Sequence, residues 1–199
     1  MNFTFKLKNI ASLAFVAITV FNLSSCKSDD NDVNPAILLD SKATVKTSTI
    51  VVPPSTTLYY DLVKNIAAEE KTSTINLSGM YGSTLKPSTT AYKFGYFDLA
   101  GKTIDAIKVS DLEMLNFTET PSLAIDASSA GQPATGPTWI IYDFKNNHAV
   151  YPTANRFVIL YKGTTLSKDA EEVIIFNAES VVALNGEATY KLKVKHFTK

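Results

Sequence analysis

The chain has few of the residues that build covalent or ionic chemistry: its 199 residues include one cysteine, two histidines and one arginine, Arg156. A single thiol leaves no partner for a disulfide within the chain and no set of thiolates for a zinc site. Basic and acidic residues balance at 19 each, and no basic run could track a phosphate backbone, so nucleic acid is not an expected partner. The apolar core must therefore hold the fold together.

The common catalytic motifs are also missing. The sequence contains no G-x-S-x-G elbow, no H-E-x-x-H and no glycine-rich phosphate loop. Two pairs of adjacent glutamates, Glu69 with Glu70 and Glu171 with Glu172, could in principle supply paired carboxylates. Neighbouring residues on a strand point to opposite faces, so neither pair makes a facing acid and base, and solvated surface charge is the expected role. We predict a protein that is not an enzyme.

The first 25 residues have the pattern of a bacterial export signal. Lys6 and Lys8 precede an apolar run over residues 10–20, which is shorter than the roughly 20 residues of a transmembrane helix. The segment ends at Leu-Ser-Ser-Cys, residues 23–26, which resembles a lipobox. We predict that residues 1–25 are removed and that Cys26 becomes the lipidated first residue. The alternative is a free cysteine after an ordinary signal peptide.

A short polar segment follows the cysteine. Lys27, Ser28, Asp29 and Asp30 resemble the acidic export tag of lipoproteins that Gram-negative bacteria display on their outer surface. A solvated tether is the plainer interpretation, and the two are compatible because polar and acidic chain buries too little surface to fold. We predict a flexible tether over residues 26–43 and an outer-membrane location facing the extracellular side.

Residues 44–199 have the composition of a β domain. Runs rich in Thr, Val, Ile, Tyr and Phe are broken by Gly, Pro, Asn and Ser. Strands are predicted over residues 44–52, 57–63, 72–78, 91–99, 103–109, 138–144, 156–162, 172–177 and 187–197. Ser110 and Glu113 fit a capping box for one short helix. The sequence therefore predicts a single all-β domain, an antiparallel sandwich or barrel-like fold with at most one short helix.

The last predicted strand alternates most clearly. One face carries Tyr190, Leu192, Val194 and His196, and the other carries Lys191, Lys193 and Lys195. We therefore expect the first face in the core and the lysines in water. The least structured internal stretch is residues 121–137, rich in Ala, Ser, Gly and Pro. A loop of that length is either functional or disordered, and the sequence leaves both open.

A motif in the C-terminal third resembles one known family. The segment Trp-Ile-Ile-Tyr-Asp-Phe at residues 139–144 leads into a polar turn with His148 and Pro152, and then into Asn-Arg-Phe-Val-Ile-Leu at residues 155–160. This order is similar to that of the HmuY family of haem-binding surface lipoproteins. The resemblance covers about residues 137–197 and extends through Ile174–Asn177 and Gly186 into the last strand. It implies an all-β lipoprotein that captures haem for uptake, with an outer-membrane haem receptor as a partner.

If haem is the ligand, the chain must supply axial donors and partners for the propionates. His148 lies in the turn where the family often carries histidine, and the thioethers of Met114 and Met80 are the other candidate axial donors. Lys145, Tyr151 and Lys162 are the candidate propionate partners. Each has an ordinary alternative, because polar residues fill turns, methionines fill gaps in cores, and lysines at strand ends are solvated.

The competing hypothesis is a surface module that binds something other than haem. Eleven Phe, nine Tyr and one Trp are compatible with stacking on sugars or with an adhesin built on a β-sandwich. Trp139 lies in the family-like strand and is expected in the core. Composition alone does not separate these functions.

Overall fold

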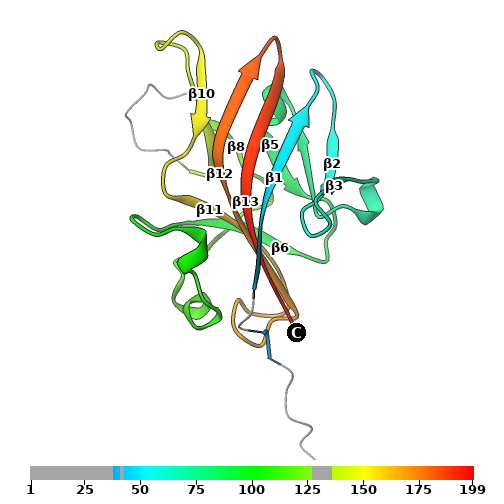
Figure 1. Ribbon diagram of the computed structural model, residues 1–199, viewed down its shortest axis with the longest axis vertical. Coiled ribbons are helices and arrows are strands. Elements are labelled where there is room, and N and C mark those ends of the chain that lie inside the picture. Colours follow the sequence, from blue (N-terminus) through cyan, green and yellow to red (C-terminus); the bar gives the residue numbers. More distant parts are fainter. Residues whose placement is uncertain (1–37, 41–42, 127–135) are drawn as a thin grey trace, which may run out of the picture. The chain divides into compact units, whose positions relative to one another are not determined.

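The computed structural model describes residues 38–40, 43–126 and 136–199, and these ranges form mostly β-strands (Figure 1). Six strands make the largest sheet, in the order β1-β13-β12-β11-β6-β7, and every neighbouring pair is antiparallel. Their bounds are β1 Thr44–Val52, β13 Glu187–Thr198, β12 Glu172–Leu184, β11 Arg156–Lys162, β6 Lys93–Asp98 and β7 Thr118–Glu119.

A second layer is assembled from two smaller sheets. Four strands run in the order β3-β2-β4-β5, with bounds Ile66–Ala67, Leu58–Asp61, Ile75–Ser78 and Thr84–Pro87. Three more run in the order β10-β9-β8, with bounds Ala149–Pro152, Thr138–Asp143 and Ala124–Asp126. A bridge between Leu85 and Leu123 links the two sheets. The main core lies between this layer and the six-stranded sheet, which is the arrangement of a β-sandwich.

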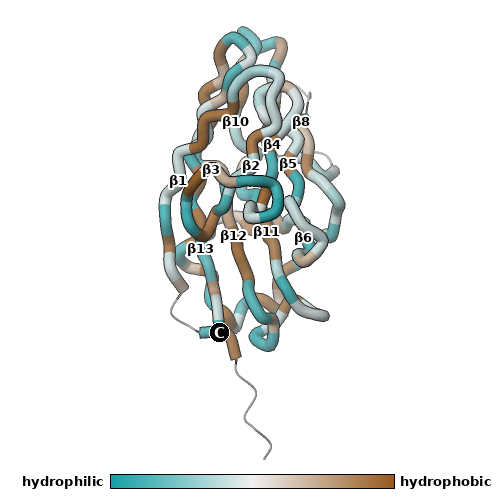
Figure 2. The backbone as a smooth tube through the Cα atoms, turned by 90° about the vertical axis from the view of Figure 1, so that its right-hand side faces the viewer, coloured by the Kyte–Doolittle hydropathy of each residue, from teal (hydrophilic) through white to brown (hydrophobic). Residues whose placement is uncertain are grey.

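The middle of the large sheet is buried on both faces. Val158 and Leu160 of β11 belong to the main core, whereas Phe157 and Ile159 belong to a second core on the opposite face. Alternate residues of β12 divide in the same way, which explains why both strands have unbroken apolar runs. Figure 2 shows the hydrophobic stretch of β12 running through the middle of the domain.

The second core is covered by short helical turns rather than by a sheet. The 3-10 segments η3 Ile104–Ala106 and η4 Val109–Met114 place Ile104 and Leu112 in this core. The cover reaches β13, where the Lys195 ammonium donates to the backbone oxygens of Asp105 and Ile107. The expectation that Lys195 lies in water is therefore wrong, because a segment distant in the sequence folds over that face.

The all-β prediction is confirmed. Some individual elements were predicted wrongly, and they lie where contacts between distant segments decide the conformation. The predicted strand at residues 103–109 is the η3 turn and its flanks, and the expected helix after Ser110 is the 3-10 segment η4. Two further turns, η1 Glu70–Thr72 and η2 Met80–Gly82, were not expected. The predicted loop at residues 121–137 contains β8, which pairs in parallel with β9, and its residues 127–135 lie outside the described ranges.

The predicted tether is partly packed on the domain. Leu39 is 5 % exposed and belongs to the second core, and the backbone of Asp40 donates to the Thr198 carbonyl. An apolar side chain at this position finds a place in the core, so the packed chain begins before Thr44. Cys26 and residues 27–30 lie outside the described residues, so lipidation and the export tag stay predictions.

Candidate functional site: the apical turns

Four turns gather at one end of the sandwich, at the top of Figure 1. They are residues 53–57, 78–83, 144–148 and 185–186, and together we call them the apical turns. A Cβ atom added at Gly186 would lie 3.3 Å from Pro54, and a pocket of about 490 Å³ is lined by residues 54–57, 78–80 and Gly186. Three of the four turns, which are far apart in the sequence, thus line one pocket.

An aromatic chain joins two of these turns. The rings of Tyr81 and Tyr142 lie 6.4 Å apart, and those of Tyr142 and His148 lie 5.7 Å apart. The Tyr142 oxygen and Nδ1 of His148 are 2.6 Å apart, a short hydrogen bond. Tyr142 is half-buried on β9, whereas His148 is exposed in the β9–β10 turn. The strand thereby holds the phenol while the turn brings the imidazole to it.

The core fixes the inner end of this chain. The hydroxyl of Tyr190 donates to the backbone oxygen of Tyr81. Tyr190 is buried and stacks on Trp139 at 4.8 Å, and the Trp139 indole N–H donates to the Ser83 carbonyl at 2.7 Å. Trp139 is therefore a core residue, as expected. These bonds position the 78–83 turn from below.

Two residues of the aromatic chain have an unusual backbone. Tyr81 has φ 58° and His148 has φ 58°, both in the left-handed region. The other described non-glycine residues with positive φ are Ser55 and four asparagines, and Asn and His are residue types that adopt this conformation more often than most. Tyr81 is the bulky exception, and holding it in this conformation costs free energy of the kind that gathers at functional sites.

The apical turns also expose thioether, aromatic and cationic groups. Met80 is 61 % exposed and Phe144 is 50 % exposed. The Lys145 ammonium lies 5.7 Å from the centre of the Phe144 ring. The Asp143 carboxylate accepts the backbone N–H groups of Lys145 and Asn146, which builds the turn that carries these residues. Three predicted site residues, His148, Met80 and Lys145, therefore share one end of the domain.

Tyr151 has a different setting. Its hydroxyl is buried, and burial followed by the nearby carboxylates of Asp143 and Asp126 raises its pKa. Negative charges beside the phenol disfavour an anionic propionate there. The role predicted for Tyr151 gains no support from this position.

Met114 and Lys162 lie elsewhere. Met114 is 76 % exposed on η4, which covers the second core toward the bottom of Figure 1. Lys162 binds the Glu172 carboxylate at 2.7 Å, at the end of β11 away from the apical turns. The structure does not bring either residue to His148.

Lys162 belongs to a second polar cluster, the basal network, formed by Tyr92, Lys162, Glu172 and His196. Glu172 accepts hydrogen bonds from Tyr92 at 2.7 Å and pairs with His196 at 2.8 Å. These partners, His196 first, lower the pKa of Glu172 to about 2, while burial raises the pKa of Tyr92 to about 12. Glu172 is not the solvated surface charge that its sequence predicts, because strands β11 and β13 and the residue 92 turn close around it.

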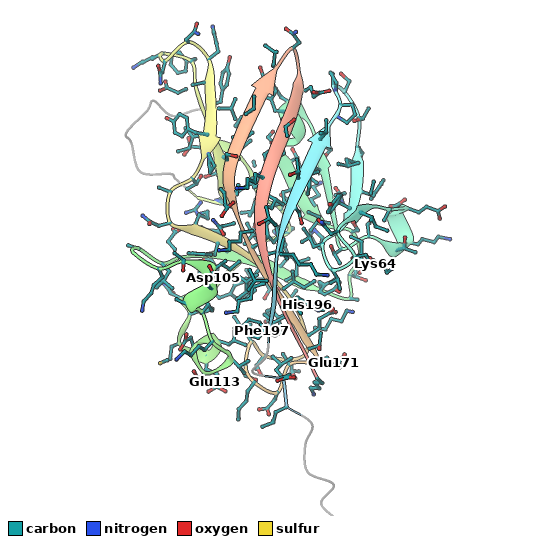
Figure 3. All side chains as sticks on the ribbon, viewed as in Figure 1. Lys64, Asp105, Glu113, Glu171, His196 and Phe197 are labelled. Atoms are coloured by element: carbon teal, nitrogen blue, oxygen red, sulfur yellow. The ribbon has the colours of Figure 1, made fainter. Side chains whose placement is uncertain are left out.

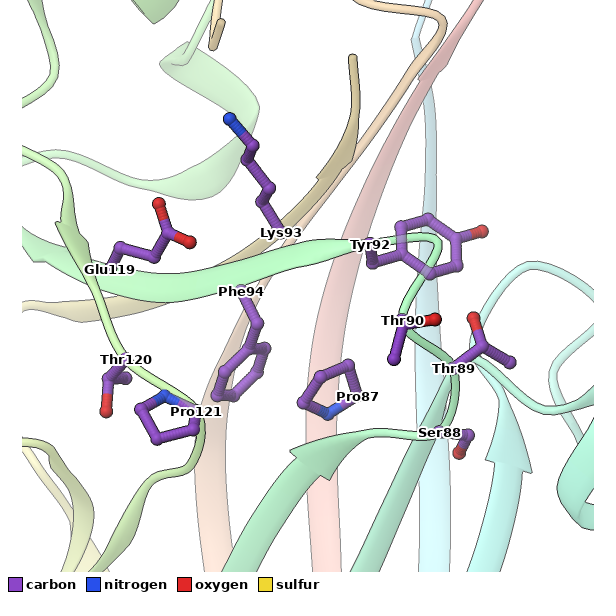
Figure 4. A pocket seen from close by; sticks show the side chains of 10 residues that line it. All are labelled: Pro87, Ser88, Thr89, Thr90, Tyr92, Lys93, Phe94, Glu119, Thr120 and Pro121. Atoms are coloured by element: carbon purple, nitrogen blue, oxygen red, sulfur yellow. The ribbon is translucent and has the colours of Figure 1, made fainter. Parts of the chain in front are cut away.

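A further pocket, of about 560 Å³, lies between the β5–β6 turn and residues 119–121. Figure 4 shows the Phe94 ring between Pro87 and Pro121. The rest of the lining is polar or amphipathic: Ser88, Thr89, Thr90, Tyr92, Lys93, Glu119 and Thr120. Apolar side chains together with the hydroxyl groups of Ser88, Thr89 and Thr90 suit a polyhydroxylated ligand.

Sequence reasoning found His148 and Met80 but missed Tyr81 and Tyr142. Tyr142 stands six residues before His148 across a tight hairpin, a spacing that brings a strand residue close to the following turn. Over the described ranges, no group of three or more His, Cys, Asp or Glu side chains could hold a metal ion by itself. Helices long and apolar enough to span a membrane are likewise absent from the part of the chain that the structure describes.

Comparisons with known proteins add no relative to this description: no family model, no curated protein and no solved structure matches the chain.

Proposed function

We propose that this chain is a surface lipoprotein that binds haem at the apical turns and passes it to an outer-membrane receptor for uptake. The observation that carries the proposal is the Tyr142–His148 pair, an exposed imidazole held 2.6 Å from a phenol oxygen. Both groups bind haem iron in proteins. The role is binding rather than catalysis.

The surroundings of the pair suit a flat, apolar ligand with two carboxylates. Tyr81, Tyr142 and Phe144 offer aromatic surface, and Phe144 is exposed although it would gain from burial. Lys145 brings a positive charge to the same turn, where a propionate would be neutralised. Met80 is the second candidate axial donor. When bound, the iron supplies the coordinate bond that separates haem from other flat apolar molecules.

Haemin titration followed by the Soret band tests the proposal. We expect the wild type to give a saturable shift, and His148→Asn and Met80→Ala to weaken it. Asparagine replaces His148 because it tolerates the left-handed backbone at that position. Met114→Ala is the matched control, since Met114 is also largely exposed, more so than Met80, but lies on η4. A wild type without a Soret shift in either redox state rules out haem binding.

The proposed location is the outer face of the outer membrane. It is supported by the Leu-Ser-Ser-Cys segment at residues 23–26 and by the acids that follow. Cys26→Ala should release a soluble form, and changing Asp29 and Asp30 to Ala should leave the lipoprotein facing the periplasm. Protease added to whole cells reads out both changes; a wild-type protein that survives this treatment would argue against surface display.

A second candidate function is saccharide binding at the 560 Å³ pocket. The observation that favours it is the apolar surface of Pro87, Phe94 and Pro121 (Figure 4) in a lining that also contains Ser88, Thr89 and Thr90. A glycan array with the wild type, followed by Glu119→Gln and Thr89→Ala on any hit, tests it. Binding that both variants leave unchanged would place the saccharide elsewhere.

A further inference from the structure

We infer that Tyr142 is the residue that bonds the iron of ferric haem, and that His148 is the positioning residue that holds its oxygen. This inference rests on the proposed function and names the ligating atom within that site. It reverses the order that the sequence suggests, in which the imidazole is the donor. The reasons lie in rigidity, in the hydrogen bond and in the chemistry of ferric iron.

Rigidity favours the tyrosine. Tyr142 stands on β9, pairs with Val150 of β10, and has its ring packed 6.4 Å from that of Tyr81. His148 stands in the turn itself and is exposed. A donor on a packed strand is held more precisely than a donor on a loop, and precise placement is what a ligating atom needs.

The hydrogen bond assigns complementary roles to the two side chains. At 2.6 Å, the Tyr142 oxygen and Nδ1 of His148 are engaged with each other. With Nδ1 unprotonated, the phenol donates its hydrogen to the imidazole, and the oxygen keeps lone pairs for a cation. Partners of this kind, one bond away from the metal, orient the ligand and raise its basicity.

The chemistry of ferric iron also favours Tyr142, because this hard cation accepts phenolate oxygen. On coordination the O–H bond of Tyr142 breaks, and its oxygen replaces the water bound to the iron of haemin. The proton passes to Nδ1 of His148 and the water leaves, with no change in oxidation state. Ferrous iron is softer, so the same site should discriminate in favour of ferric haem.

The test compares Tyr142→Phe, His148→Asn and the control Tyr59→Phe, a partly exposed tyrosine of β2 outside the apical turns. The probes are haemin, haemin reduced with dithionite, and metal-free protoporphyrin IX. We expect Tyr142→Phe to remove the ferric phenolate charge-transfer band and nearly all haemin affinity. His148→Asn should keep the band but weaken affinity about 10- to 100-fold. Tyr59→Phe should match the wild type.

Metal-free protoporphyrin IX distinguishes a variant that has lost iron coordination from one that has lost the surface that binds the porphyrin ring. We expect Tyr142→Phe and the wild type to bind it equally, because it offers no metal, and we expect dithionite to weaken only the wild type. If Tyr142→Phe keeps its haemin spectrum and affinity while His148→Asn loses both, the imidazole is the donor and this inference is wrong, with haem binding intact. If the wild type shows no haemin spectrum, the proposed function itself fails.

Discussion

The two histidines of this chain make the same kind of contact in opposite settings. His148 lies 2.6 Å from the Tyr142 oxygen among the apical turns, and His196 lies 2.8 Å from a Glu172 oxygen in the basal network. His148 is exposed, whereas the side chains of His196 and Glu172 are only 13 % and 18 % exposed. Because the two contacts are similar, burial is what distinguishes the histidines. An exposed side chain can contact a ligand, whereas a buried one stabilises the fold.

The two sites also differ in how the chain builds them. The apical pair is local, because its two partners are six positions apart in one hairpin. The basal network joins residues 24 and 80 positions apart, so it forms only when the strands assemble. Figure 3 places His196 low in the sheet, next to Phe197 and away from the turns at the top. We therefore expect the basal network to govern stability and the apical pair to govern binding.

The largest expected effect is on stability at acid pH. The folded pKa of Glu172 is about 2, against an ordinary 4.5. A depressed pKa means that the stabilisation is fully present above about pH 4.5 and is lost as the pH falls toward 2. The loss is at most about 3 kcal/mol. Urea unfolding between pH 2 and 6 measures it; a Glu172→Gln variant should show a flatter profile, and an unchanged profile would contradict this assignment.

Removing the basal carboxylate at neutral pH should have the next largest effect. Glu172→Gln leaves the Lys162 charge and His196 without their anionic partner, so we expect the free energy of unfolding to fall by about 1–3 kcal/mol. Glu171→Gln is the matched control, because Glu171 is the exposed neighbour (Figure 3). Equal losses in the two variants would show that the network contributes little.

The smallest effects come from the histidines themselves. His196→Asn removes a partly buried partner of Glu172 and should cost about 1 kcal/mol. His148→Asn alters an exposed turn and keeps its backbone, so a change within about 0.5 kcal/mol is expected. Urea unfolding and haemin titration on the same preparations should give opposite rankings of the two variants. If one variant caused the larger loss of both stability and haemin affinity, the basal network and the apical pair would not have separate roles.

Much of the fold could be predicted from local pattern. The strands at residues 44–52 and 156–162 were predicted at their observed bounds, since unbroken β-forming runs leave little choice of conformation. Leu192 and Val194 are buried, as the alternation of β13 indicates. The short strands β8 and β10 escaped prediction because their pairing with β9, and not their own composition, stabilises them.

The candidate site was predictable only in part. His148 and Met80 were singled out by residue type, but nothing local connects the 78–83 turn with the β9–β10 hairpin. That connection is the packing of Tyr81 on Tyr142, which depends on how the two smaller sheets join through Leu85 and Leu123. Glu172 was misjudged for the same reason, because its partners come from other strands.

By itself, the sequence determined the all-β class and the inward face of β13, because period-two burial is a property of neighbouring residues along one strand. The tertiary structure decided which polar residues leave water. Lys195 is buried because η3 folds over it, Glu172 because three strands and a turn meet there, and Tyr142 is half-buried against a turn 61 positions away. Such burial depends on contacts between distant segments, and no pattern along the chain encodes it directly.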